Sequence, residues 1–249
     1  MKVSIITPVF NASRFLEETA KSVLDQSYSN WEWLLIDDCS QDNSWAIMQE
    51  LAQKDPRIRI YQNDTNMRAG KTRNRAIDLA EGRFIAFLDS DDMWHTEKLK
   101  VQIPFMLDNN YSFSHTSYGY LDEEGRNIKS TLHVSKEVDY QHLLKYTEIS
   151  CLTAVYDTQN IGKWYMSEHA RKQDYALWLS ILKSGVKSYG IDQELAYYRQ
   201  VKGSATSKKY KLIWKHVIFL KQTQGFSTLK AIYYTSYWMV NGFIRYFLK

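Results

Sequence analysis

The stretch RFIAFLDSDD (Arg83–Asp92) joins an apolar run to a cluster of carboxylates. Its first six residues are typical of a buried β-strand, and Asp89, Asp91 and Asp92 follow almost directly. Open α/β sheets bind ligands at the carboxyl ends of their strands, and carboxylate oxygens favour Mg²⁺ or Mn²⁺. The cluster therefore indicates a cation site. The alternative is an N-cap ahead of a helix over Thr96–Asn109, for which one Asp or Ser would be enough.

The first hundred residues alternate strand and helix patterns. Strands are predicted over Lys2–Thr7, Trp33–Asp37, Ile58–Gln62 and Arg83–Leu88, and helices over Ser13–Gln26, Ser44–Lys54 and Gly70–Ala80. Strands separated by such helices favour right-handed βαβ units and a parallel sheet, so the predicted class is α/β. Asn11 or Ser13 is expected to cap the first helix, and Asp42 or Asn43 the second.

The pattern is looser after Asp108. The predicted elements are a hairpin from Tyr111 through the turn DEEG to Ile128, a strand over Ser150–Tyr156, a helix over Asp174–Lys183 and one or two short strands within Tyr189–Arg199. No internal repeat or low-complexity linker interrupts the sequence. A chain of 249 residues can bury a full core, and we expect one catalytic-sized unit.

Cysteine content and the opening residues bear on the compartment. Cys39 and Cys151 are too few for a disulfide framework and have no neighbours at metal-ligand spacing, which favours a reducing compartment. The opening MKVSIITPVF runs directly into a strand pattern and lacks the regions of a signal peptide. We therefore expect the active face in the cytoplasm.

Charge is distributed unevenly along the chain. The formal net charge is +4, but residues 195–249 carry ten Lys or Arg and no Asp or Glu. The first 194 residues hold 22 basic and 28 acidic side chains, a charge of −6. This split predicts a tail that meets an anionic surface and a body that behaves as an ordinary enzyme domain, with no nucleic acid as partner.

Two amphipathic helices are predicted in this tail, over Leu212–Gln222 and Leu229–Leu248. The second stretch is long enough to span a bilayer, but Asn241 and its Ser, Thr and Tyr residues make it a poor span. A basic, aromatic helix that lies in the membrane interface fits better. The alternative is a helix pair packed on the body or on a partner subunit, so a homo-oligomer stays open.

Carboxylates recur at three places that an α/β sheet would bring to one cleft. Asp37 and Asp38 end the second strand, the acidic cluster ends the fourth, and Asp174 begins a later helix. A cation-binding pair with a separate carboxylate fits transfer chemistry on a phosphate-bearing substrate. The cation would neutralise a diphosphate leaving group, and the distant carboxylate would accept a proton from an attacking hydroxyl.

Five sequence blocks resemble the family 2 glycosyltransferases of the GT-A fold, in the order usual for that family. They are IITPVFN (Ile5–Asn11), LIDDCS (Leu35–Ser40), RNR with AEG (Arg73–Arg75 and Ala80–Gly82), FLDSDD (Phe87–Asp92) and QDYALWL (Gln173–Leu179). The segment YRQVKGSATS (Tyr198–Ser207) is similar to the bacterial surface-polysaccharide branch. The resemblance implies a catalytic domain over 1–207, with a Rossmann-like, mostly parallel sheet flanked by helices, and a helical tail over 208–249.

The resemblance also implies residue roles. Thr7, Pro8, Phe10 and Asn11 match the first-strand loop that holds the nucleoside. Asp38 matches the carboxylate that binds uracil, with Asp37 beside it; Asp91 matches the direct metal ligand and Asp89 the ribose-side member of the acidic pair. Asp174 matches the general base of inverting members, and Gln173 stands where Glu is more frequent.

Each of these assignments has a structural alternative. Asp37 and Asp38 could form a turn and cap, and Asp174 could be a first-turn acid favoured by the helix dipole. Arg73 and Arg75 are read as phosphate contacts, with solvated helix residues as the alternative. Arg199 with Lys202 either approaches the same phosphates when a loop closes or simply flanks the basic tail.

Three other matches are weighed, of which the phosphatase motif stays an alternative. AGKT (Ala69–Thr72) resembles the end of a P-loop, but Thr65 stands where that motif requires Gly. Asp89–Met93 resembles the motif of haloacid-dehalogenase-like phosphatases, except that Met93 replaces Thr or Val. His95 lies near the acidic cluster but is more typical of an ordinary loop residue.

The expected function is that of an inverting, Mn²⁺- or Mg²⁺-dependent glycosyltransferase. A UDP-sugar is the expected donor, and a lipid-linked saccharide of cell-surface polysaccharide assembly is the expected acceptor. The expected location is the inner face of the cell membrane, as a peripheral protein. No Gln-x-x-Arg-Trp block of processive synthases is present, so one sugar is expected per encounter. The choice of sugar and linkage depends on loops around Trp94, Tyr118, Trp164 and His169. The alternatives are the phosphatase and a catalytically silent membrane-recruiting scaffold.

Overall fold

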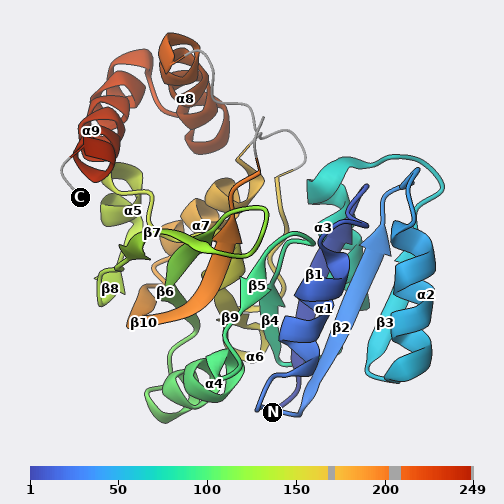
Figure 1. Cartoon of the computed structure of the whole chain (residues 1–249). Helices are drawn as coiled ribbons and strands as arrows, with labels where there is room; N and C mark the ends of the chain where they lie inside the picture. The colour runs from blue at the N-terminus through green and yellow to red at the C-terminus, as the bar shows by residue number, and fades with distance from the viewer. Residues whose placement is uncertain (168–171, 202–208, 248–249) are drawn as a thin grey trace.

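The fold is a central mixed sheet with helices on both faces (Figure 1). The structure is a computed structural model, and it describes residues 1–167, 172–201 and 209–247. The strands are β1 (Val3–Val9), β2 (Trp31–Asp37), β3 (Ile58–Gln62), β4 (Phe84–Phe87), β5 (Met93–Trp94), β6 (Phe113–Leu121), β7 (Asn127–Leu132), β8 (Glu137–Val138), β9 (Val155–Asp157) and β10 (Ser188–Arg199). The helices are α1 (Leu16–Leu24), α2 (Ser44–Lys54), α3 (Arg68–Leu79), α4 (Lys98–Asp108), α5 (Tyr140–Lys145), the short 3₁₀ helix η1 (Cys151–Thr153), α6 (Thr158–Ile161), α7 (Gln173–Lys183), α8 (Lys209–Gln224) and α9 (Thr228–Phe247).

Strand order explains where a ligand can bind. The sheet runs β3-β2-β1-β4-β9-β6-β10-β5, and the first four of these strands are mutually parallel. The chain therefore moves outward from β1 to β3 and then returns to the other side of β1 as β4. The loops after β1 and β4 diverge at this point, and such a switch point is where open α/β sheets form their ligand crevice. β9 is antiparallel to its neighbours β4 and β6, whereas β10 is parallel to β6.

Two apolar cores fill the two faces of the sheet. Ile5 of β1 packs in a core with residues of α1, α2 and α4, whereas the next residue, Ile6, packs in a core with residues of α3, α5 and α7. Because side chains of a strand alternate between faces, the near-continuous apolar run of β1 supplies both cores. This double burial holds the carboxyl end of β1 in place between β2 and β4.

Most predicted elements are confirmed, and the differences have local causes. The hairpin is β6–β7, and the region 189–199 is a single irregular strand, β10. The predicted strand over Ser150–Tyr156 is wrong in its first part, where η1 precedes β9. The predicted caps of the first helix are also wrong, because α1 begins after Phe15 without a side-chain cap. Asp42 instead accepts hydrogen bonds from the backbone N–H groups of Ser13 and Ser44, and so links the starts of α1 and α2.

The tail helices pack on the body. Val217, Phe219, Leu220, Ala231 and Tyr234 are buried in the same core as α5 and α7. Figure 1 shows α9 beside α5 and α8 beside α9, on the opposite side of the molecule from β2, β3 and α2. The alternative of a helix pair packed on the body therefore holds for the buried side of α8 and α9. Their other side is exposed and apolar, as described below.

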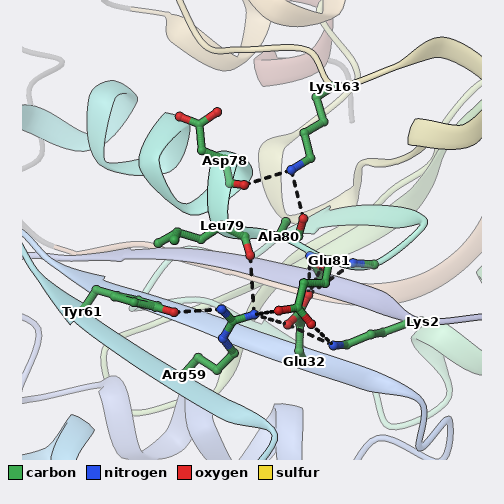
Figure 2. A network of polar contacts seen from close by, with 11 residues as sticks. Lys2, Glu32, Arg59, Tyr61, Asp78, Leu79, Ala80, Glu81 and Lys163 are labelled. Carbon is green, nitrogen blue, oxygen red and sulfur yellow. Dashed lines mark hydrogen bonds and ion pairs between the residues drawn. The ribbon is translucent and has the colours of Figure 1, made fainter.

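The amino ends of the parallel strands carry a network of ion pairs (Figure 2). Lys2, Glu32, Arg59 and Glu81, called here the amino-edge network, join β1, β2 and β3 to the turn before β4. Nearby, Lys163 donates to the carbonyl oxygens of Asp78 and Ala80 at the end of α3. The charged groups at the amino edge are paired with one another. The candidate ligand crevice lies at the opposite, carboxyl edge.

Candidate active site

The acidic loop, residues 89–92, is held in a tight turn. The Asp92 N–H donates to the Asp89 carbonyl oxygen at 3.2 Å. The Thr19 hydroxyl, from α1, donates to the carbonyl oxygens of Ser90 (3.1 Å) and Asp92 (2.8 Å). The proposed alternative role as a cap of α4 is not seen, because that helix begins at Lys98 with Glu97 at its N-cap. These contacts anchor the loop through its backbone.

Arg199 supports this loop from behind. Its backbone N–H donates to the Asp92 carboxylate at 2.9 Å, and its Nε donates to the Asp91 carbonyl oxygen at 2.8 Å. The guanidinium is fully buried and also pairs with Glu18 at 2.6 Å. Arg199 does not line the cavity, contrary to its expected approach to phosphates, because these contacts use its donors. Lys202 lies outside the described residues.

A cavity of about 410 Å³ opens in front of the loop, at the switch point between β1 and β4. Its lining residues come from the end of β1, from the loops after β1, β2, β3 and β4, and from α3: Pro8, Val9, Phe10, Asp38, Asn66, Arg68, Ala69, Arg73, Asp89, Ser90 and Asp91. A cavity of this size is in the range of small-molecule sites. The structure thus brings Pro8, Phe10, Asp38, Arg73, Asp89 and Asp91 together, as the sequence predicts.

Asp38 and Asp37 have different surroundings. Asp38 lines the cavity, and its Oδ1 accepts from Asn63 Nδ2 (2.8 Å) and from the Met67 N–H (2.7 Å). Asp37 is fully buried outside the cavity lining, where it accepts from Ser40 N–H and Gln62 Nε2. Of the two residues, Asp37 therefore has the structural role in the turn that was the alternative for both.

The two other residues of the predicted first-strand loop lie beside the cavity rather than in its lining. Thr7 is buried, and its hydroxyl oxygen accepts from Trp33 Nε1 at 2.8 Å. Asn11 has a positive φ of 49°, and its side-chain oxygen accepts from the Gln41 N–H at 2.7 Å. Both side chains shape the loop that carries Pro8 and Phe10.

The cations at the cavity come from α3. Arg73 is buried, donates to Asp89 Oδ1, and its Nε has no hydrogen-bond partner among the described residues. Arg68 also lines the cavity and was missed by sequence reasoning, although it directly precedes the AGKT decoy. Arg75 is not in the lining, because it donates to the Gln62 carbonyl oxygen and to Asn63 Oδ1.

Electrostatics single out the acidic loop. Burial, and then the charge of Asp89, raise the pKa of Asp91 to about 6, although Arg199 and Arg73 act in the opposite direction. Burial together with Asp91 and Asp89 likewise raises the pKa of Asp92 well above its ordinary value. The loop therefore holds more negative charge than its cations neutralise, and a bound divalent cation would relieve this excess.

Asp174 lies in the first turn of α7, half-buried. Burial raises the pKa of its carboxyl; the Tyr175 backbone N–H and Arg73 oppose this rise, and Asp89 adds to it. Its neighbour Gln173 packs so closely on α3 that a Cβ at Gly70 would lie 2.6 Å from Gln173 Cδ. Arg73 and Asp89 both influence the pKa of Asp174, so the three charged groups lie near one another. Asp174 is not among the residues that line the cavity.

The carboxylate oxygens of the acidic loop are the candidate ligands for a metal ion. The described residues contain no group of three His, Cys, Asp or Glu side chains arranged to hold a metal. Asp89 and Asp91 nevertheless line one cavity with hard oxygen donors. Mg²⁺ is commonly held by one or two carboxylates together with substrate phosphates, so this pair fits such a cation. His95 does not line this cavity, and its Nδ1 accepts from the Glu97 N–H.

The residues proposed to select the sugar are spread out. Trp94 donates from Nε1 to the Leu152 carbonyl oxygen and Trp164 to the Ile161 carbonyl oxygen, and neither lines the cavity. Tyr118 packs against Tyr120 with ring centres 5.3 Å apart. His169 lies outside the described residues.

Comparison with known proteins decides the family. Residues 4–171 match the model of the family described as glycosyl transferase family 2. The chain belongs to glycosyl transferase family 2. This glycosyltransferase is 38% identical over 229 residues to TuaG of Bacillus subtilis, a glycosyltransferase named for teichuronic acid biosynthesis, covering 92% of the present chain and 91% of TuaG. It is 36% identical over 247 residues to the Escherichia coli UDP-Glc:alpha-D-GlcNAc-diphosphoundecaprenol beta-1,3-glucosyltransferase WfaP, covering 98% and 95% of the two chains.

Solved structures show the same fold. Staphylococcus aureus TarS (residues 1–349), in complex with UDP-GlcNAc, superposes with a TM-score of 0.74 at 21% identity over 98% of this glycosyltransferase and 73% of that chain. The mannosyltransferase PcManGT of Pyrobaculum calidifontis, in complex with GDP-Man and Mn²⁺, gives 0.67 at 13% identity, with 95% and 69% covered. The predicted GT-A fold is confirmed, and the family match favours a glycosyltransferase over the phosphatase. Among the described residues, no helix combines the length and apolar character of a membrane span.

Proposed function

We propose that this glycosyltransferase moves a sugar from a UDP-sugar to a hydroxyl of a lipid-linked saccharide, with inversion at the anomeric carbon, in cell-surface polysaccharide assembly. The observation that carries the proposal is the cavity, which is lined by Asp38, Arg73, Asp89 and Asp91. The name of WfaP, which includes a UDP-sugar and a diphosphoundecaprenol acceptor, supports the choice of donor and acceptor.

The cavity suits the two halves of such a donor. On the base side, Asn63 Nδ2 and the Met67 N–H both donate to Oδ1 of Asp38, which leaves Oδ2 for the ligand among the described residues. Pro8 and Phe10 offer apolar surface for a planar ring. On the phosphate side, Arg68 and Arg73 supply positive charge, and Arg73 Nε is buried without a partner among the described residues. Guanidinium groups bind phosphate oxygens through charge-assisted hydrogen bonds.

Asp91 and Asp89 are the residues proposed to hold Mn²⁺ or Mg²⁺. When bound, the cation supplies charge neutralisation for the departing diphosphate. Arg73 fixes the Asp89 carboxylate, and Arg199 fixes the loop backbone, so both carboxylates are oriented before the substrate arrives.

Asp174 is proposed as the general base. Its raised pKa makes the carboxylate a better proton acceptor than an exposed aspartate, and it shares the electrostatic field of Arg73 and Asp89. It accepts the proton of the acceptor hydroxyl while the hydroxyl oxygen attacks the anomeric carbon from the side opposite the diphosphate. One displacement inverts the configuration of that carbon.

The tail is proposed to dock the enzyme on the inner membrane surface as a functional unit, residues 208–249, distinct from the catalytic unit, residues 1–207. Its side away from the body, the outer tail face, exposes Trp214, Ile218, Leu229, Ile232, Met239 and Val240. Trp214 is 59% and Leu229 81% exposed, and Lys215, Lys221 and Lys230 are exposed nearby in sequence. Apolar and aromatic side chains with flanking lysines bind the interface of an anionic bilayer.

The transfer proposal is tested with purified protein, Mn²⁺, a panel of nucleotide sugars and a diphosphoundecaprenol-linked sugar. We expect nucleotide diphosphate release that depends on the acceptor, with UDP-sugars as the best donors, and a product of inverted anomeric configuration by NMR. Transfer that persists unchanged in both Asp91→Asn and Asp174→Asn would contradict the residue roles. Retention of configuration would contradict the single displacement.

The membrane proposal needs substitutions rather than truncation, because the tail shares a core with the body. We expect Trp214→Ser combined with Leu229→Ser to weaken flotation with phosphatidylglycerol vesicles severalfold. Ile128→Ser is the matched control, since Ile128 is also an exposed apolar residue but lies on β7. Equal flotation of all three proteins would remove the membrane argument.

A further inference from the structure

Lys172, the residue that precedes helix α7, is held by both tail helices. Its Nζ lies 3.3 Å from Nδ1 of His216 on α8 and 4.3 Å from the ring centre of Trp238 on α9. The His216 and Trp238 rings stack on each other with centres 4.6 Å apart. We call Lys172, His216 and Trp238 the tail–helix contact. It joins the tail to the helix that carries Asp174 two residues further on.

The charges at this contact are suited to hold a cation. Burial, and then Lys172, lower the pKa of His216 to about 3, so the imidazole is neutral and its Nδ1 can accept from the ammonium. Burial lowers the pKa of Lys172 to about 8, while Asp174 opposes this shift. Lys172 therefore stays protonated at neutral pH and is attracted to the Trp238 ring.

A lysine is an unfavourable residue at this place without such partners. The amino end of a helix is the positive end of its dipole, and burial penalises a second positive charge there. The tail supplies a neutral acceptor and an aromatic face, and Asp174 supplies a negative charge. Lys172 thus ties the first turn of α7 to α8 and α9 rather than stabilising the helix by itself.

Other contacts fix the same turn from different sides. Gln173 packs against Gly70 of α3, and the Tyr175 hydroxyl donates to the Leu143 carbonyl oxygen of α5 at 3.1 Å. The Tyr175 ring also stacks on Phe219 of α8 with centres 5.3 Å apart. Residues of the tail helices therefore contact the first turn of α7, which carries Asp174, on one side.

We propose that Lys172, His216 and Trp238 are positioning residues for Asp174, so that the tail takes part in the chemical step as well as in membrane docking. The inference rests on the proposed function, because it takes Asp174 as the base. A displacement of a catalytic group by about 1 Å can cost about 10²-fold in rate. Donor binding is expected to be independent of the contact, since the cavity lining contains no residue of α7, α8 or α9.

The test compares two lysines that each lie over a tail aromatic ring. Lys172→Met removes the tail–helix contact, whereas Lys145→Met removes the contact of α5 with Tyr237, whose ring centre is 5.2 Å from Lys145 Nζ. Both lysines are half-buried. Transfer is measured with saturating acceptor, and kcat is expressed per nucleotide-binding site counted by calorimetry. This normalisation removes the effect of any unfolded fraction.

We expect Lys172→Met to lower kcat at least tenfold with the donor KM within twofold, and Lys172→Arg to restore kcat to within threefold. Trp238→Leu, which keeps apolar packing but removes the ring, is expected to lower kcat in the same direction. Lys145→Met is expected to stay within twofold of the wild type. Equal values for Lys172→Met and Lys145→Met, or no rescue by Lys172→Arg, would overturn the proposal. Asp174→Asn distinguishes failure of the general-base assignment from failure of the positioning role. If Asp174→Asn retains transfer, the assignment of Asp174 as the base is wrong. If Asp174→Asn is inactive and Lys172→Met is unaffected, only the positioning role is refuted.

Discussion

The two edges of the parallel half of the sheet use buried carboxylates in opposite ways. At the amino edge, Glu32 has only 3% of its side chain exposed and pairs with Lys2 at 3.2 Å and Arg59 at 2.8 Å. At the carboxyl edge, Asp91 lines a cavity beside Asp89, and Arg73 contacts Asp89 instead. The Glu32 carboxylate thus has two cationic partners at the amino edge, whereas at the carboxyl edge the Arg73 contact goes to Asp89 and not to Asp91.

The pKa values follow the partners rather than burial itself. Burial raises the pKa of Glu32, but hydrogen bonds from Ser4, the Glu81 N–H, Arg59 and Lys2 outweigh burial and lower it below its ordinary value. For Asp91, burial and Asp89 act in the same direction and raise the pKa to about 6. For these two carboxylates, the sign of the pKa shift depends on whether donors and cations or another carboxylate lie next to the buried group.

The largest expected effect is on catalysis at the carboxyl edge. Asp91→Asn should lower kcat for sugar transfer by about 10²- to 10⁴-fold, because it removes a ligand of the proposed cation. Chelation of the wild type with EDTA should give a comparable loss that Mn²⁺ reverses. Steady-state transfer assays at several Mn²⁺ concentrations measure both. Full activity of Asp91→Asn in EDTA would contradict the proposed cation site at the carboxyl edge.

The next effect is on stability at the amino edge. Glu32→Gln should lower the free energy of unfolding by about 2 kcal/mol at pH 7, because charged hydrogen bonds of a buried group are lost. Its pKa is lowered in the folded state, so the loss should fade as the pH falls through that folded pKa. Urea unfolding at several pH values measures this. The kcat per folded molecule should not change, and a large fall in kcat would blur the distinction between the edges.

A third prediction concerns pH and uses Asp91 in the metal-free protein. Its pKa is raised from an ordinary value of 3.8 to about 6, so its favourable contribution is present below pH 4 and is lost as the pH rises through 6. Asp91→Asn should therefore gain stability relative to the wild type, by on the order of 2 kcal/mol, between pH 4 and 7. Urea unfolding in EDTA measures the difference, which Mn²⁺ should diminish. A constant difference across this range would contradict the raised pKa.

The smallest effect is expected from Glu81. Its side chain is 61% exposed, although it pairs with Lys2 and Arg59 in the same network as Glu32. Exposed ion pairs are screened by solvent, so Glu81→Gln should leave the urea midpoint within error of the wild type. A loss equal to that of Glu32→Gln would show that the network, rather than the buried carboxylate, stabilises this edge.

Local patterns in the sequence predict the strands, the helices and the acidic pair. The apolar run before Asp89 is unambiguous because it is both continuous and followed by carboxylates. The run before β9 is ambiguous, since Cys151 and Leu152 are buried equally well in a 3₁₀ turn or a strand. Asn11 was a reasonable cap by composition, but its amide binds Gln41, thirty residues away.

Roles that depend on distant partners are not visible in the sequence. Arg199 looks like a phosphate ligand until its contacts with Glu18, Asp91 and Asp92 are known. The amphipathic tail predicts helices, but the pattern does not tell which side meets the body. Arg68 was missed because its use depends on where the turn after β3 meets the loop after β4.

The anchoring of the acidic loop by Arg199 has a consequence for the order of biosynthesis. The cavity lining is complete at Asp91, but the loop is tied down by a residue 107 positions after Asp92. A nascent chain must therefore release β10 from the ribosome before the loop can take its final place, and β10 must pair with β5 and β6. Residues 209–247 follow β10 directly in the sequence, so the anchored acidic loop and the proposed membrane contact arise in close succession during synthesis.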